Sequence, residues 1–470
     1  MFRTIIRARS ARAVIVLALA TTSVPVIGAV TQSRALAATG CQSTASTPIP
    51  QPTQAQLDAA GLGNIPLAPD SARRDLVAAP FSDPTAVTNP LFPIAKLDSA
   101  ILNGHVDGKL FYTETTLLPF TRIIEWTPGQ CVRVLVSQYM AFLDGKLQET
   151  AIDLYAQADD GSVWYLGEDV FDYDAAGRIF TTEGTWHAGT EGPAAMIMPS
   201  DPQIGDAHRP ENIPGTVFEE VSITKVDQTF EGPSGPISGG IVGTETHQDG
   251  TLSDKLFAPG YGEFRSTDGP DVEAMALASP TDSLPGGVPA ELTTISQGAD
   301  RVFSSPLATP AQWRRAEGVA KGMVEAWNTF RAGDVPPRLV KPTSLALQEL
   351  VAQIASRDRT KARTASIDAS YASINLQLRY LPVTEVDTVR FELWARRALV
   401  HAIDGSLGGV RSDLVTIEWI RDRFVHTVDP VIRTRIDTLV RDLGTAVVDD
   451  DLKAAADSAR ALRTVVADLI

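Results

Sequence analysis

The acidic side chains with the most regular spacing lie in the run DYDAAGRIFTTE, residues 172–183. Counted from Asp172, acids occupy positions one, three and twelve (Asp172, Asp174 and Glu183), and Gly177 occupies position six. EF-hand calcium loops share this spacing, because calcium needs several oxygen atoms that converge from a sharply bent backbone. The pattern predicts a calcium-type cation site at these three carboxylates, and we expect no other cofactor.

An acidic hairpin turn is the alternative interpretation of this run. Position five of the loop is Ala176, whose side chain has no oxygen donor. The flanking segments, 163–166 and 184–187, lack the helical pattern that surrounds an EF-hand loop. Both interpretations therefore stay open at the level of the sequence.

Other recognisable reaction centres are missing from the sequence. Six histidines occur, and no two of them have the three- or four-residue spacing that places metal ligands on one helical face. The sequence has no Gly-x-Ser-x-Gly elbow, no His-Glu-x-x-His motif, no phosphate-binding loop and no dinucleotide fingerprint. We assign no catalytic residue. A secreted hydrolase whose acids are scattered along the chain remains an alternative, because sequence does not display the spatial separation of two acids.

The sequence contains two cysteines, Cys41 and Cys131. In an oxidising compartment they are expected to form a disulfide that ties the N-terminal segment to the strand-rich part of the chain. The alternative is that Gly40-Cys41 ends a lipid-attachment motif, which would leave Cys131 as a free thiol.

The first 38 residues have the pattern of a secretory signal peptide. Four arginines lead into an apolar run over 13–30, and Ala35-Leu36-Ala37 offers a small-x-small cleavage site. We therefore expect a secreted, extracellular protein with no stable membrane span after cleavage, and a lipid anchor on Cys41 is the alternative. A retained transmembrane anchor is the weaker interpretation, because Pro25 and three polar residues interrupt the apolar run.

Composition and charge narrow the class of protein. The 470 residues are 44% hydrophobic and 21% charged, which is ordinary for a chain that buries a core. Loss of the five arginines of the leader lowers the net charge from −16 to about −21. Such an acidic surface repels phosphate backbones, so we expect a protein or small-molecule partner and no nucleic acid.

The periodicity of apolar residues changes along the chain. Residues 39–88 are rich in Pro, Ser and Ala and are expected to form a linker arm. Over 89–268, short runs of β-branched and aromatic residues are separated by tight-turn signals such as Asp144-Gly145 and Asp249-Gly250. Strands joined by such turns are antiparallel neighbours, so we predict an antiparallel β meander or part-closed barrel.

A second linker is expected over 269–310, and an all-α helical bundle over 311–470. Apolar residues from Trp313 to Trp327 recur near the spacing of one helical face. The predicted fold class is thus α and β, in two separately folded parts. Residues 39–310 carry 13 basic and 36 acidic side chains, whereas 311–470 carry 23 and 21, a difference that would attract the two parts to each other.

The β segment carries a series of short motifs in a set order. They are NPLFP (89–93), LYAQ (154–157), VWYLGE (163–168), EGTW (183–186), IMP (197–199) and FAPGYG (257–262). In this series, residues 89–265 resemble a group of uncharacterised bacterial exported proteins and lipoproteins. The resemblance implies export and a β fold, and it implies no particular reaction.

The sequence therefore predicts a secreted or cell-envelope protein that binds a ligand or partner without catalysing a reaction. Four aromatic residues of the β segment are the candidates for a binding face: Trp164, Tyr165, Trp186 and Tyr261. Aromatic residues at alternate strand positions also build hydrophobic cores. The alternatives are a cation-binding protein that uses the carboxylates of 168–183, and a secreted hydrolase.

Overall fold

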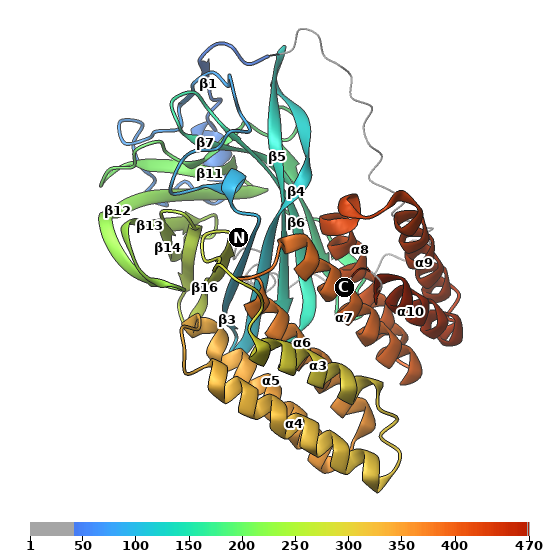
Figure 1. Cartoon of the computed structure of the whole chain (residues 1–470). Coiled ribbons are helices and arrows are strands. Elements are labelled where there is room, and N and C mark those ends of the chain that lie inside the picture. Colours follow the sequence, from blue (N-terminus) through green and yellow to red (C-terminus); the bar gives the residue numbers. More distant parts are fainter. Residues whose placement is uncertain (1–41, 468, 470) are drawn as a thin grey trace.

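A computed structural model describes residues 42–467 and residue 469 of the chain. Figure 1 shows a large, curved antiparallel sheet with helices beside and below it. The predicted order of an antiparallel β part followed by a helical bundle is confirmed. Within the described residues the main sheet has 14 strands and stays open. Cys131 is disulfide-bonded; its predicted partner Cys41 and the predicted signal peptide over 1–38 lie outside the described residues.

Two antiparallel meanders make up the sheet. The first consists of β3 (Ser99–Val106), β4 (Lys109–Thr127), β5 (Gln130–Leu143), β6 (Lys146–Gln157) and β7 (Val163–Tyr173), with β8 (Ile179–Thr181), β9 (Trp186–His187) and β10 (Ala195–Met198) each paired to β7. The second consists of β11 (Ala207–Ile213), β12 (Val217–Gly232), β13 (Gly235–His247), β14 (Leu252–Ala258), β15 (Gly262–Asp268) and β16 (Asp271–Ser279). Antiparallel pairing of β16 with β3 joins the meanders into one sheet.

Tight turns set the order of neighbouring strands, as the sequence indicated. Asp144 and Gly145, between β5 and β6, have φ of 49° and 73°, the backbone that a two-residue hairpin turn requires. Asp107 and Gly108 join β3 to β4 with φ of 54° and 72°. Such turns leave no room for a crossover, so consecutive strands pair and the meander follows.

The range expected as a linker, 269–310, contains regular structure at both ends. β16 occupies its start and helix α3 (Ala290–Ser304) its end, so residues 280–289 connect the sheet to the helices. The Pro and Gly residues at 285–287 mark this connection. The preceding apolar run becomes a strand because it pairs with β3, a partner far away in the sequence.

Residues 42–98 form an arm that packs on the sheet. It contains β1 (Thr47–Pro48), α2 (Gln54–Ala59), β2 (Val77–Ala78) and the 3₁₀ turn η1 (Ile94–Lys96). Ile49, Phe81 and Leu91 are buried in one cluster with residues of the sheet. The buried carboxylate of Asp75 also accepts a hydrogen bond of 3.0 Å from the backbone of Arg209 in β11. The arm therefore covers part of the sheet.

Eight α-helices follow the sheet within the described residues. They are α3, α4 (Pro310–Phe330), α5 (Pro337–Ser356), α6 (Arg359–Gln377), α7 (Val383–Ile403), α8 (Leu407–Phe424), α9 (Pro430–Val448) and α10 (Leu452–Ala467), with the 3₁₀ turn η2 (Val425–Thr427) after α8. Proline opens α4, α5 and α9, where its missing N–H costs no helical hydrogen bond.

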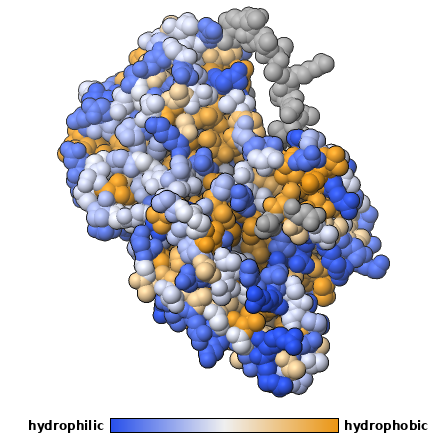
Figure 2. Space-filling model, in the orientation of Figure 1, coloured by the Kyte–Doolittle hydropathy of each residue, from blue (hydrophilic) through white to orange (hydrophobic). Residues whose placement is uncertain are grey.

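The surface differs between the two ends of the bundle. Figure 2 shows apolar side chains along the boundary between the sheet and the helices, whereas the tip formed by α4 and α5 is largely hydrophilic. Among the described helices, none combines the length and the apolar character that crossing a membrane would need.

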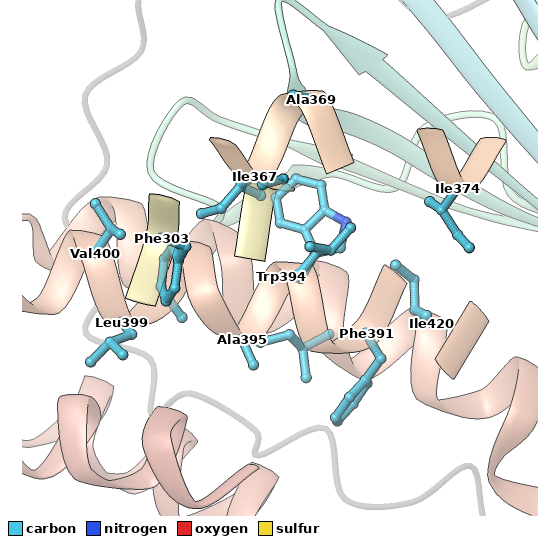
Figure 3. Close-up of a cluster of buried hydrophobic side chains, with 14 of the residues drawn as sticks. Phe303, Ile367, Ala369, Ile374, Phe391, Trp394, Ala395, Leu399, Val400 and Ile420 are labelled. Atoms are coloured by element: carbon cyan, nitrogen blue, oxygen red, sulfur yellow. The ribbon is translucent and has the colours of Figure 1, made fainter. Parts of the chain in front are cut away.

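The helices pack on the convex face of the sheet and share a hydrophobic core with it (Figure 1). Met140 and Phe142 of β5 belong to the same buried cluster as residues of α3, α6, α7 and α8. The Phe142 ring stacks on Trp394 of α7, with ring centroids 5.7 Å apart. Figure 3 shows Trp394 beneath Ile367 and Ala369 of α6. Sheet and bundle are thus continuous here, whereas the periodicity alone indicated two separately folded parts.

A buried ion cluster fastens the helices to the sheet. Glu114 of β4 lies between Arg390 of α7 and Arg423 of α8, and all three side chains are fully buried. The hydroxyls of Tyr112 and Tyr371 each donate a 2.6 Å hydrogen bond to its Oε1. Burial alone would raise the pKa of Glu114, but the two guanidinium groups and these hydrogen bonds lower it to about 2. The carboxylate therefore stays ionised inside the protein.

We expect Glu114→Gln to destabilise the fold by about 3 kcal/mol, because two buried guanidinium groups lose one of their two carboxylate partners and keep only Asp387. Unfolding in urea measures the change. Glu125→Gln, at an exposed position of the same strand, is the matched control and should change the free energy of unfolding by less than about 0.5 kcal/mol.

The stability difference between the wild type and E114Q should also depend on pH. The folded pKa of Glu114 lies below its ordinary value of 4.5, so its stabilisation is present above that value and is lost as the pH falls toward 2. The wild type and E114Q should therefore converge in stability at low pH. Equal stabilities near about pH 7 would contradict the role of the cluster.

Candidate ligand-binding cavity in the curved sheet

The acidic run predicted as a calcium loop is a hairpin that connects β7 to β8 and continues beyond it. Asp172 is buried in β7, and Glu183 is exposed after β8. Asp174 lies in the turn, where hydrogen bonds from the backbone and Nε of Arg178 lower its pKa. Within the described residues, these carboxylates belong to no converging group of metal-type ligands. The backbone here matches the hairpin interpretation of the run.

The four aromatic candidates divide into two kinds. Trp164 and Trp186 are completely buried in the hydrophobic core. Tyr165 and Tyr261 line a cavity on the concave face of the sheet. All four thus belong to hydrophobic core clusters, and the two tyrosines in addition line the candidate binding site.

Both meanders contribute to this cavity. The cavity has a volume of about 90 Å³, which is room for several waters or for part of a small ligand. The walls are mainly aliphatic and aromatic, with residues such as Leu102, Val221, Phe257 and Met275. Phe92 and its neighbours, from the end of the N-terminal arm, complete the lining.

Tyrosines form the wall that belongs to the first meander. Tyr139 of β5, Tyr155 of β6 and Tyr165 of β7 point to the concave face, because alternate residues of a strand point to opposite faces. The rings of Tyr155 and Tyr165 stack with centroids 4.9 Å apart, and Phe92 meets Tyr155 edge-on at 5.0 Å. The hydroxyl of Tyr165 donates a 2.6 Å hydrogen bond to Asp153. Packing therefore holds this aromatic wall in place.

Charged residues mark the wall that belongs to the second meander. Nζ of Lys255 in β14 lies 3.4 Å from Glu245 of β13 and 3.3 Å from Glu263 of β15. Burial and the nearby Glu219 raise the pKa of Glu245, although Lys255 acts in the opposite direction. One ammonium group thus serves two carboxylates at this wall.

Glu273 of β16 is a third acid in the lining. It is 2% exposed, and Oγ1 of Thr113 donates a hydrogen bond of 2.5 Å to its Oε1. Its Oε2 is buried and has no hydrogen-bond partner among the described residues. Burial, and next the charge of Glu263, raise the pKa of Glu273 to about 7. The carboxylate therefore changes its charge near neutral pH.

A polar group next to the cavity has the composition of a metal site. Glu219, Glu245 and His247 place one ligand atom each within 4.8 Å of one another. Ser253 Oγ lies 2.9 Å from Nε2 of His247. Hydrogen bonding and charge from Glu219 raise the pKa of His247 despite its burial. These residues lie on one face of the sheet. The two carboxylates could hold a bound cation there, or they could stabilise His247 in its protonated form.

The sequence analysis did not predict this group, because it searched only for pairs of histidines three or four residues apart, the spacing of a helix. On a strand, residues two apart share a face, so Glu245 and His247 already pointed to one side of the sheet. Glu219 lies opposite His247 through the pairing of β12 with β13, which sequence spacing does not show.

No protein-family model matches the chain, and no curated protein matches it. The resemblance of residues 89–265 to exported bacterial proteins stays a prediction.

Glu273→Gln should become more stable relative to the wild type as the pH rises. The raised folded pKa means that Glu273 stabilises the fold at low pH and that this contribution is lost between about 4.5 and 7. Between about pH 5 and 8.5 the difference should shift by about 2 kcal/mol in favour of E273Q, measured by urea unfolding. Glu125→Gln is the control, and a pH-independent difference for E273Q would contradict the burial of an ionising carboxyl.

Proposed function

We propose that the chain is an exported protein that binds a small molecule with a largely apolar body in the cavity of its curved sheet, without catalysing a reaction. One observation carries the proposal, namely a partly open cavity with aliphatic and aromatic walls and a few polar groups. Ligand sites have this composition, because apolar walls supply binding free energy and polar groups orient the ligand. Support for export comes from the leader pattern of residues 1–38.

The cavity walls are rigid, which favours a ligand-binding site over a loosely packed region of the hydrophobic core. Tyr139, Tyr155 and Tyr165 stand on adjacent strands of a continuous hydrogen-bonded ladder. On the opposite face, Met140 packs in the core shared with the helices, and Leu154 and Trp164 pack in the cluster that includes the N-terminal arm, so the strands are held from behind. A site on rigid strands loses little conformational entropy when a ligand enters.

Filling the cavity tests the proposal. Ala100 of β3 lines the cavity, and Ala100→Phe should weaken binding of the neutral fluorescent probe N-phenyl-1-naphthylamine by about tenfold or more. Fluorescence titration gives the affinity, and thermal melting verifies that the variant is folded. Ala311→Phe, at an exposed position of α4, is the matched control and should bind like the wild type. A probe that binds none of the three proteins, or all three equally, would contradict the proposal.

Cation binding is a second candidate, and the group of Glu219, Glu245 and His247 favours it. Two carboxylates and an imidazole are a ligand set that zinc accepts, with water in the remaining position. The side chain of His247 is 22% exposed, which gives an ion a path from solvent. Lys255, 3.4 Å from Glu245, would have to move toward Glu263 when a cation binds.

Thermal melting tests this second candidate. If the site binds zinc, about 100 µM zinc should raise the melting temperature by several degrees over the value in EDTA, because a ligand that binds only the folded state stabilises it. His247→Ala should abolish the rise. His105→Ala, at an exposed position of β3, is the matched control and should keep it. Identical melting of the wild type in zinc and in EDTA would exclude the site.

A further inference from the structure

Glu273 is a wall group of the cavity whose hydrogen bonding is incomplete. Thr113 satisfies Oε1, whereas Oε2 is buried without a hydrogen-bond partner among the described residues. A buried carboxylate oxygen without a donor costs free energy, since it has lost water and gained nothing in return. A ligand that brings a donor to Oε2 would recover this cost, and Glu273 is one of the residues that line the cavity.

The charges of the lining favour a positive ligand group. Among the described lining residues, Glu245, Glu263 and Glu273 are acidic and Lys255 is the one base. Lys255 lies against Glu245 and Glu263. Three carboxylates of the lining thus share one ammonium group, whose charge also acts on Glu273. An anionic ligand would meet desolvated negative charge, which is unfavourable in a low-dielectric space.

The aromatic wall suits the same chemistry. Tyr139 of β5 stands close enough to Glu273 for the acid's charge to contribute, after burial, to the raised pKa of the tyrosine. Tyr155 and Tyr165 continue the wall beyond it. Aromatic ring faces attract ammonium groups, and carboxylate together with tyrosine rings is a common environment for amines.

We propose that the ligand of this cavity is a hydrophobic amine, whose protonated nitrogen donates a hydrogen bond to Oε2 of Glu273 while its apolar part lies among the tyrosine and aliphatic side chains. This proposal rests on the proposed small-molecule function and names the chemical class of the ligand. A neutral ligand with a hydroxyl donor is the competing class, and the experiment below distinguishes the two.

Two probes with the same apolar chain separate charge from hydrophobicity. Decylamine and decanol compete with N-phenyl-1-naphthylamine for the cavity at about pH 8, where the amine is protonated and Glu273 is mostly ionised. On the wild type, decylamine should displace the fluorescent probe at about tenfold lower concentration than decanol. Glu273→Gln keeps the shape of the side chain and removes its charge, so the two compounds should become equal within about twofold.

The controls separate failure of this proposal from failure of the proposed function. Glu125→Gln, on the same sheet but exposed, should keep the preference for decylamine. If both compounds displace the probe equally from the wild type, or if E273Q keeps the preference, the amine proposal is wrong while the cavity function stands. If the probe binds the wild type but neither compound displaces it, the amine proposal fails and the cavity function stands; if the probe does not bind, both proposals fail.

Discussion

A carboxylate that is held between two arginines, out of reach of water, ties the helical bundle to the sheet. Glu114 has this role, with Arg390 and Arg423 supplied by two different helices. Asp387 pairs with the same two arginines, and removing any member of such a cluster unbalances its buried charges, which favours docking of the helices on the sheet. Because Glu114 points to the convex face, its neighbours Thr113 and Thr115 point to the concave face, which the helices leave to the cavity.

The same strands therefore pack against the helical core with one face and line the cavity with the other. In β5, Met140 and Phe142 pack against helices, while Tyr139 lines the cavity. A strand that is covered on both faces has no solvent side and needs few polar residues. This explains why β5 is buried along most of its length, and why its sequence resembles a hydrophobic core strand more than one wall of a binding site.

The acidic composition does not reflect the protein surface alone, because some of the acidic side chains are buried. Residues 39–310 hold 36 acidic side chains, a number that suggests a solvated surface. Several of these acids, including Glu114, Glu245 and Glu273, lie inside the protein. Their pKa values move in opposite directions: two arginines and hydrogen bonds outweigh burial and lower that of Glu114, whereas burial and next the charge of Glu263 raise that of Glu273. Acidity here is partly a property of the interior.

Local patterns were enough to predict the class of fold. The turn at Asp144-Gly145 and the helical spacing after Trp313 depend on residues that are close in sequence, so strand order and helices followed from them. The cavity depends on distant partners: Thr113 and Glu273, which share a hydrogen bond, are 160 residues apart. Only the pairing of β16 with β3 brings them together, and long-range register of this kind has no signature in the spacing of neighbouring residues.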